Sequence, residues 1–200
     1  RKIRSTGRLL NGSSRFSLDG TEIKHFIGVS AFSEYTVIME KALVKVPEGF
    51  PLQQAALLGC AVITGMGAVT NAARVKPGSC VAVFGSGGVG LNVVQGAALS
   101  GAEKIIAVDL LDNKLDLARQ FGATHTVNAS SSDPVEQILS LTGQKGVNYA
   151  FEVIGRPETL RQAYDCLAKR GEAIALGVTP FETEVSIPIM GLIFDERVLR

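Results

Sequence analysis

The chain has 200 residues, which allows one full domain and part of another, and its hydrophobic content of 46% is typical of a globular protein with a substantial core. Twenty basic and nineteen acidic residues leave a net charge of +1, so we expect neither a nucleic-acid partner nor attraction to an anionic membrane surface. No apolar run approaches the roughly 18 residues of a membrane span, so we expect none.

The cysteines indicate the cellular compartment, and the first residue indicates whether the chain is part of a longer polypeptide. Cys60, Cys80 and Cys166 lie far apart and are odd in number, so we expect no disulfide framework and predict a reducing cytoplasm. The chain opens on Arg1 rather than Met, without a basic-then-apolar leader. We expect it to begin partway through a longer polypeptide.

Before residue 60, short apolar runs are separated by turn signals such as Asn11-Gly12 and Asp19-Gly20. Three of these runs are predicted strands of an antiparallel β region: residues 26–29, 35–38 and 42–46.

After residue 80 the sequence alternates between strand and helix patterns. Five runs are predicted strands: residues 81–84, 104–109, 126–127, 147–151 and 172–176. Helices are predicted between them, the last two from Pro134 and Pro157 to stops at Gly143 and Gly171. Crossover helices join parallel strands, so the pattern predicts a doubly wound α/β fold. Residues 198–200 either begin a sixth strand or lie just short of it.

A glycine-rich turn, Gly85-Ser86-Gly87-Gly88-Val89-Gly90, joins the first of these strands to the first helix. Glycine patterns are often ordinary turns, but this position is typical of a dinucleotide-binding turn. Gly85 would permit the tight turn, and Gly90 close packing of helix on strand. Gly87 would let the backbone approach the pyrophosphate, and Gly88 and Val89 begin the helix whose positive N-terminus attracts it.

An acidic residue supports this interpretation. Asp109 ends the second predicted strand, nineteen residues after Gly90, where the ribose-binding acid is expected. Its carboxylate could accept both ribose hydroxyls and would repel a 2′-phosphate, which favours NAD over NADP. The other interpretation, a helix cap near Asp112, is less favoured because Asp112 can itself be the cap.

Six stretches together carry a resemblance to a known family: GSSRF (12–16), FSEYTV (32–37), LGCAVITG (58–65), VFGSGGVG (83–90), GAT (122–124) and FEVIG (151–155). In order and spacing they resemble the zinc-dependent medium-chain alcohol dehydrogenases. The resemblance implies part of a GroES-like antiparallel β domain over residues 1–61. It also implies a Rossmann-type NAD-binding domain over residues 62–200, lacking most of its last strand.

The resemblance also implies roles for single residues. Cys60 matches a ligand of the catalytic zinc, although its apolar surroundings alone would make it a small buried residue. Thr64 matches a position near the nicotinamide end of the cofactor, and Lys114 a lysine beside the adenosine ribose. Apolar positions of the cofactor cleft are matched by Ile154, Leu176 and Val178.

The implied activity is reversible, NAD-dependent oxidation of an alcohol to an aldehyde or ketone by zinc-assisted hydride transfer. No Gly-His-Glu motif is present, Cys80 and Cys166 are expected to be structural, and His25 and His125 are expected at the surface or in loops. One thiolate cannot hold zinc in a tetrahedral site, so we expect the 200 residues alone to be inactive. The full-length protein is expected to be a homo-oligomer that acts on a small alcohol or aldehyde.

Two other functions stay open. One is a zinc-free oxidoreductase of the quinone-reductase type, which Cys60 and Asp109 disfavour. The other is an NAD-binding module without catalysis.

Overall fold

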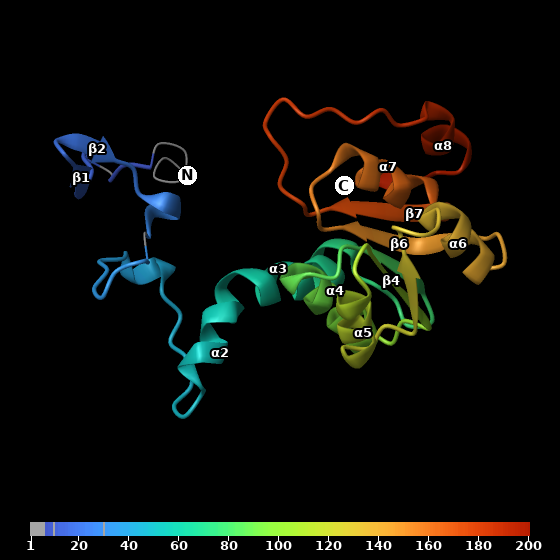
Figure 1. The fold of residues 1–200 in the computed structure, drawn as a ribbon, viewed down its shortest axis with the longest axis horizontal. Helices are drawn as coiled ribbons and strands as arrows, with labels where there is room; N and C mark the ends of the chain where they lie inside the picture. Colours follow the sequence, from blue (N-terminus) through green and yellow to red (C-terminus); the bar gives the residue numbers. More distant parts are fainter. Residues whose placement is uncertain (1–6, 10, 30) are drawn as a thin grey trace. The chain divides into compact units, whose positions relative to one another are not determined.

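The computed structural model describes residues 7–9, 11–29 and 31–200, and the chain divides into two compact units, Arg1–Phe50 and Pro51–Arg200 (Figure 1). The domain boundary predicted between residues 61 and 62 falls inside a helical segment of the second unit. That boundary stays a prediction.

The first unit contains a small hairpin. Strands β1 (Phe16–Leu18) and β2 (Thr21–Ile23) pair antiparallel. The turn residues Asp19 and Gly20 have φ values of 49° and 77°, which suits the turn type that Asp-Gly favours in hairpins. His25 packs against the Phe16 ring at 4.7 Å and is only 2% exposed, so it is buried within the loop between β2 and η1 rather than at the surface.

The three strands predicted after this hairpin are wrong. Short 3-10 helices occupy η1 (Phe26–Gly28) and η2 (Glu40–Ala42), and no strand covers residues 35–38. A strand requires a hydrogen-bonded partner. Among the described residues of this unit only β1 and β2 provide one another with such a partner.

The second unit is built on a six-stranded parallel sheet with the order β5-β4-β3-β6-β7-β8. Its strands are β3 (Cys80–Phe84), β4 (Lys104–Asp109), β5 (His125–Asn128), β6 (Val147–Glu152), β7 (Leu167–Ala175) and β8 (Val198–Leu199). All five predicted strands are confirmed, and β8 is the sixth. This order is that of the Rossmann-type doubly wound fold, as predicted.

Helices cover both faces of the sheet (Figure 1). They are α4 (Gly88–Leu99), α5 (Asp112–Gln120), α6 (Pro134–Leu141) and α7 (Pro157–Asp165), and a short α8 (Ile189–Phe194) precedes β8. Alternate residues of each strand face opposite layers. Val81 and Val83 pack with α4 and α5, whereas Ala82 and Phe84 pack with α6 and α7.

The two predicted helix stops have different outcomes. Gly143 follows the end of α6 with a φ of 60° and is confirmed as a terminator. Gly171 is not one, because α7 ends at Asp165 and Gly171 lies within β7. The start of β7 is bulged between its pairings with Val147 and Tyr149, and this irregularity accommodates the extra residues before Gly171.

A continuous helical segment of 22 residues, Leu52–Ala73, precedes the sheet. It comprises α2 (Leu52–Leu57), η3 (Leu58–Val62), α3 (Ile63–Gly67) and η4 (Ala68–Ala73), and η3 and η4 are π-helical. Its apolar window has a mean hydropathy of 1.5 and is 17% buried, so length and composition alone would allow a membrane span. Length and composition of a single helix are weak evidence for a span, so the expectation that the chain has none stays a prediction.

The two halves of this segment differ in burial. Ala68, Val69 and Ala73 are buried in the core against the sheet. The largely exposed half, Leu52 to Ile63, extends about 18 Å at helical rise. This is well short of the roughly 30 Å of bilayer hydrocarbon.

Candidate functional site

The glycine turn between β3 and α4 has a backbone that other residues could not adopt. Gly85 has a φ of +102°, and its N–H donates to the Val108 carbonyl at 2.8 Å. A Cβ on Gly90 would lie 1.8 Å from the Gly85 carbonyl oxygen. The predicted reasons for these two glycines therefore match the local geometry.

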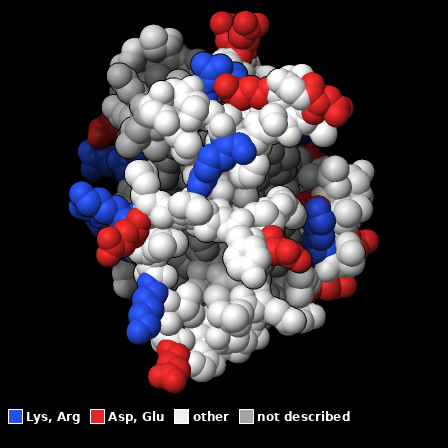
Figure 2. Space-filling view, turned by 90° about the vertical axis from the view of Figure 1, so that its left-hand side faces the viewer, with Lys and Arg blue, Asp and Glu red and all other residues white. Residues whose placement is uncertain are grey.

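The N-terminus of α4 is open toward solvent. Gly87 is its N-cap and supplies no side-chain hydrogen bond, and a Cβ on Gly87 would meet no atom within 4 Å. The first amide N–H groups of this 12-residue helix carry a partial positive charge. Basic and acidic side chains are interspersed on the face of the molecule seen in Figure 2. At the N-terminus of α4 the exposed backbone of Gly87 and Gly88 is a geometry that suits an anion.

Asp109 connects the end of β4 to this turn. Its Oδ2 accepts from the Ser86 N–H at 2.8 Å, and its Oδ1 accepts from the N–H groups of Leu110 and Leu111 at 2.8 and 3.2 Å. The side chain of Leu111, the N-cap of α5, makes no capping bond. Asp109 therefore forms a tight side-chain turn just before α5, but its bonds do not reach the amides that a helix cap satisfies. Each carboxylate oxygen has two lone pairs, so one acceptor position remains, on Oδ2, for a ribose hydroxyl.

A cavity of about 380 Å³ lies beside Asp109. Three predicted cofactor residues, Asp109, Lys114 and Ile154, line it together. The other lining residues are Phe84, Val108, Leu110, Ala129, Arg156, Glu158, Thr159 and Gln162. Its size falls in the range of small-molecule sites. Arg156 and Pro157 were predicted only as a helix start, and Thr159 and Gln162 were not predicted to line a site. Helical spacing from Pro157 places these two residues on one face of α7.

Leu176 and Val178 do not line this cavity. The Leu176 N–H donates to the Glu152 carbonyl at 2.8 Å, and its side chain packs on the core layer under α4. Val178 is 92% exposed. Its carbonyl lies so close to Gly155 that a Cβ there would be 2.5 Å away. The two residues belong to a neighbouring loop, and their contact with a cofactor stays a prediction.

Cys60 lies within the π-helical segment η3 and is exposed. Interruptions of this kind are frequent at functional sites. The neighbouring Ala61 has its Cβ 3.6 Å from where a Cβ of Gly88 would stand, so η3 packs beside the glycine turn. Thr64, one turn later in α3, is half-buried. The catalytic roles of Cys60 and Thr64 stay predictions.

The residues present do not make a zinc site by themselves. Within residues 7–9, 11–29 and 31–200, no group of three or more His, Cys, Asp or Glu side chains is placed to hold a metal ion. A catalytic zinc takes three protein ligands and a water. Cys166 is fully buried, and burial raises the pKa of its thiol to about 12. Burial also raises the pKa of the Cys80 thiol, so neither thiol is disposed to become a thiolate ligand.

Comparison with known proteins supports this reading of the fold. Residues 88–200 match the model of a family described as zinc-binding dehydrogenase. The chain is 43% identical over 194 residues to S-(hydroxymethyl)glutathione dehydrogenase of Paracoccus denitrificans, covering 93% of this chain and 52% of that protein. The chain therefore spans about half the length of this relative.

Two solved structures are similar. Benzyl alcohol dehydrogenase from Acinetobacter calcoaceticus is 34% identical, with a TM-score of 0.88 over 96% of this chain and 52% of that one. A structure from Sinorhizobium meliloti 1021 described as a zinc-binding dehydrogenase bound to NADP is 35% identical, with a TM-score of 0.65 over 70% of this chain and 42% of that one.

Proposed function

Since the chain belongs to the zinc-binding dehydrogenase family, we propose that it is the dinucleotide-binding part of an oxidoreductase that interconverts an alcohol and an aldehyde or ketone with NAD. The observation that carries the proposal is the open N-terminus of α4 beside a cavity lined by Asp109, Lys114 and Ile154. A pyrophosphate would bind the first amides of α4, and the adenosine ribose would bind Asp109.

The chain's part in the reaction is to bind and orient. When bound, the nicotinamide ring of the cofactor supplies the hydride acceptor. The first amides of α4 hold the phosphates, and the cavity beside β4 holds the adenosine end. Together they fix the direction in which the rest of the cofactor extends from the carboxyl ends of the strands. Such positioning is a large part of what an enzyme contributes to hydride transfer.

We propose NAD rather than NADP because the Asp109 carboxylate would repel a 2′-phosphate. Titration of the chain with NADH and NADPH, followed by nucleotide fluorescence, tests this choice. We expect tighter NADH binding, and an Asp109→Asn variant should weaken NADH binding by about tenfold, as expected for lost hydrogen bonds to a charged group. Asp116→Asn is the control, since Asp116 is an exposed residue of α5 paired with Arg119. Preference of the unaltered chain for NADPH would overturn the choice of cofactor.

Zinc chemistry is a separate part of the proposal. Cys60 is proposed as one zinc ligand in a longer protein, and the described residues hold no complete ligand set for the metal. The second candidate, a zinc-free oxidoreductase of the quinone-reductase type, stays open although Cys60 and Asp109 disfavour it. Metal analysis of the full-length protein separates the two, because bound zinc excludes the second candidate and its absence excludes the first.

Substrate, compartment and assembly are proposed at the level of class. The relatives named above act on S-(hydroxymethyl)glutathione and benzyl alcohol by their names, so a primary alcohol is the proposed substrate class. The three free cysteines fit a reducing, cytoplasmic compartment, and a homo-oligomer is proposed for the full-length protein. We expect no NAD-linked oxidation of benzyl alcohol by these 200 residues alone, measured as NADH absorbance.

A further inference from the structure

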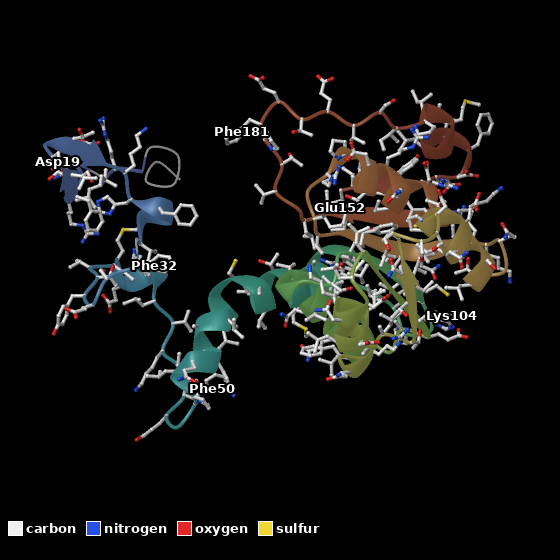
Figure 3. The ribbon with its side chains drawn as sticks, in the orientation of Figure 1. Asp19, Phe32, Phe50, Lys104, Glu152 and Phe181 are labelled. Atoms are coloured by element: carbon white, nitrogen blue, oxygen red, sulfur yellow. The ribbon has the colours of Figure 1, made fainter. Side chains whose placement is uncertain are left out.

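A buried carboxylate stands where two loops leave the sheet. Glu152 is the last residue of β6 and only 2% exposed. Figure 3 shows it beside the point where the chain leaves β7 toward Phe181. One carboxylate oxygen, Oε1, accepts from the N–H groups of Ile154 and Gly155 at 2.9 Å each, and from the Thr159 hydroxyl at 2.7 Å.

These three donors belong to the loop after β6 and to the first turn of α7. Ile154 and Thr159 both line the cavity beside Asp109. The carboxylate therefore holds two residues of the cavity wall, Ile154 and Thr159, although Glu152 does not itself line this cavity. Val153, next to Glu152, also donates its N–H to the Phe84 carbonyl at 3.1 Å and lies against the glycine turn.

The same residue holds the loop after β7 through its main chain. Its carbonyl accepts from the N–H groups of Leu176 and Gly177 at 2.8 and 3.1 Å. A Cβ on Gly177 would lie 1.9 Å from the Gly155 nitrogen and 2.7 Å from Glu152 Oε2. The two loops are thus packed so closely that a movement of one displaces the other.

Burying a carboxylate is costly unless hydrogen bonds compensate the lost hydration. An apolar side chain at the end of a buried strand would avoid that cost, but it would leave the Ile154 and Gly155 amides without an acceptor. We propose that Glu152 is the positioning residue of the cofactor cleft, because it holds the loops after β6 and β7 in one arrangement. This inference rests on the proposed function only for its binding readout.

The test compares Glu152→Leu with Glu152→Gln in the full 200-residue chain. Leucine removes the acceptor at similar volume, whereas glutamine keeps an oxygen for the same three donors. We expect Glu152→Leu to raise the NADH Kd by about tenfold or more, because buried donors lose a charged acceptor. Glu152→Gln should recover most of the affinity. Glu136→Leu, an exposed residue of α6, is the matched control and should bind NADH as the unaltered chain does.

Backbone hydrogen exchange gives a readout that needs no cofactor. In Glu152→Leu we expect faster exchange at Ile154, Gly155, Leu176 and Gly177, with unchanged protection in β3 and β4. A general loss of stability would instead speed exchange throughout the sheet, and that result would overturn the proposal. Unchanged exchange in both loops, or equal NADH affinity of Glu152→Leu and the unaltered chain, would also overturn it.

The two arms separate this inference from the proposed function. If the unaltered chain binds no dinucleotide, the cofactor proposal fails while the exchange experiment still decides the role of Glu152. If Glu152→Leu does not fold, Thr159→Val against Thr159→Ser tests one donor of the same cluster. We expect only the valine variant to speed exchange at Ile154 and Gly155, and equal behaviour of the two variants would contradict the proposal.

Discussion

The two compact units of the chain differ in how far they bury their apolar side chains. Before residue 51, His25 is the one buried side chain among those the structure describes, and Phe32 and Tyr35 are 110% and 90% exposed. In the second unit, alternate residues of the parallel strands fill two core layers that helices cover. The difference shows that an apolar run becomes a strand only where a neighbouring strand and a covering layer are available.

The largest expected effect tests this contrast in packing. Phe151 in β6 is fully buried in the layer under α4. We expect Phe151→Ala to lower the free energy of unfolding by about 3–5 kcal/mol, the usual cost of removing a buried aromatic ring. Phe32→Ala should change it by less than about 0.5 kcal/mol. Urea denaturation measures both, and a comparable loss for the two variants would show that the units do not differ in packing.

The strands predicted in the second unit are confirmed, whereas those predicted in the first unit are wrong. Strands β3 and β4 are buried almost throughout, so their continuous apolar runs identify them directly from the sequence. The run at 42–46 has a similar composition, but Val44 is 90% exposed and belongs to no strand. Propensity alone does not distinguish the two situations, because the missing information is the presence of a partner.

The candidate site was predictable to a similar extent. Gly85, Gly90 and Asp109 follow from local rules of a strand-turn-helix unit, and they lie where those rules place them. Glu152 lies in the FEVIG stretch that resembles the family, but nothing in the sequence alone shows that its carboxylate is buried and accepts three hydrogen bonds. Gly171 was mistaken for a helix terminator because a bulged strand and a helix end both use glycine.

A pair of glycine substitutions separates folding from binding within the better-predicted unit. A Cβ on Gly90 would collide with the Gly85 carbonyl, so Gly90→Ala should destabilise the unit by about 1–3 kcal/mol. Gly87 has a φ of −84° and open space around its Cβ position, so Gly87→Ala should fold normally.

Binding should rank these two variants differently from stability. A methyl group on Gly87 stands at the open N-terminus of α4, where the pyrophosphate would approach. We expect Gly87→Ala to raise the NADH Kd by about tenfold, comparable to one lost hydrogen bond to a charged group, at an unchanged melting temperature. Normal NADH binding by Gly87→Ala would place the phosphates elsewhere.

The smallest effect compares the exposed helical segment with the buried core through their thiols. Burial raises the Cys166 pKa from 9.0 to about 12, so the folded chain retains this proton at pH values where the unfolded chain releases it. The stabilising contribution of Cys166 is therefore complete below pH 9 and declines as the pH rises toward 12, by at most roughly 1.4 kcal/mol per pH unit. Urea denaturation at pH 8 and pH 10 should show this decline, and Cys166→Ala should reduce it.

At pH 8 a thiol reagent should label exposed Cys60 first and Cys166 only after unfolding. Equal labelling rates for these two thiols would mean that the core layer under α7 opens as readily as the surface of η3.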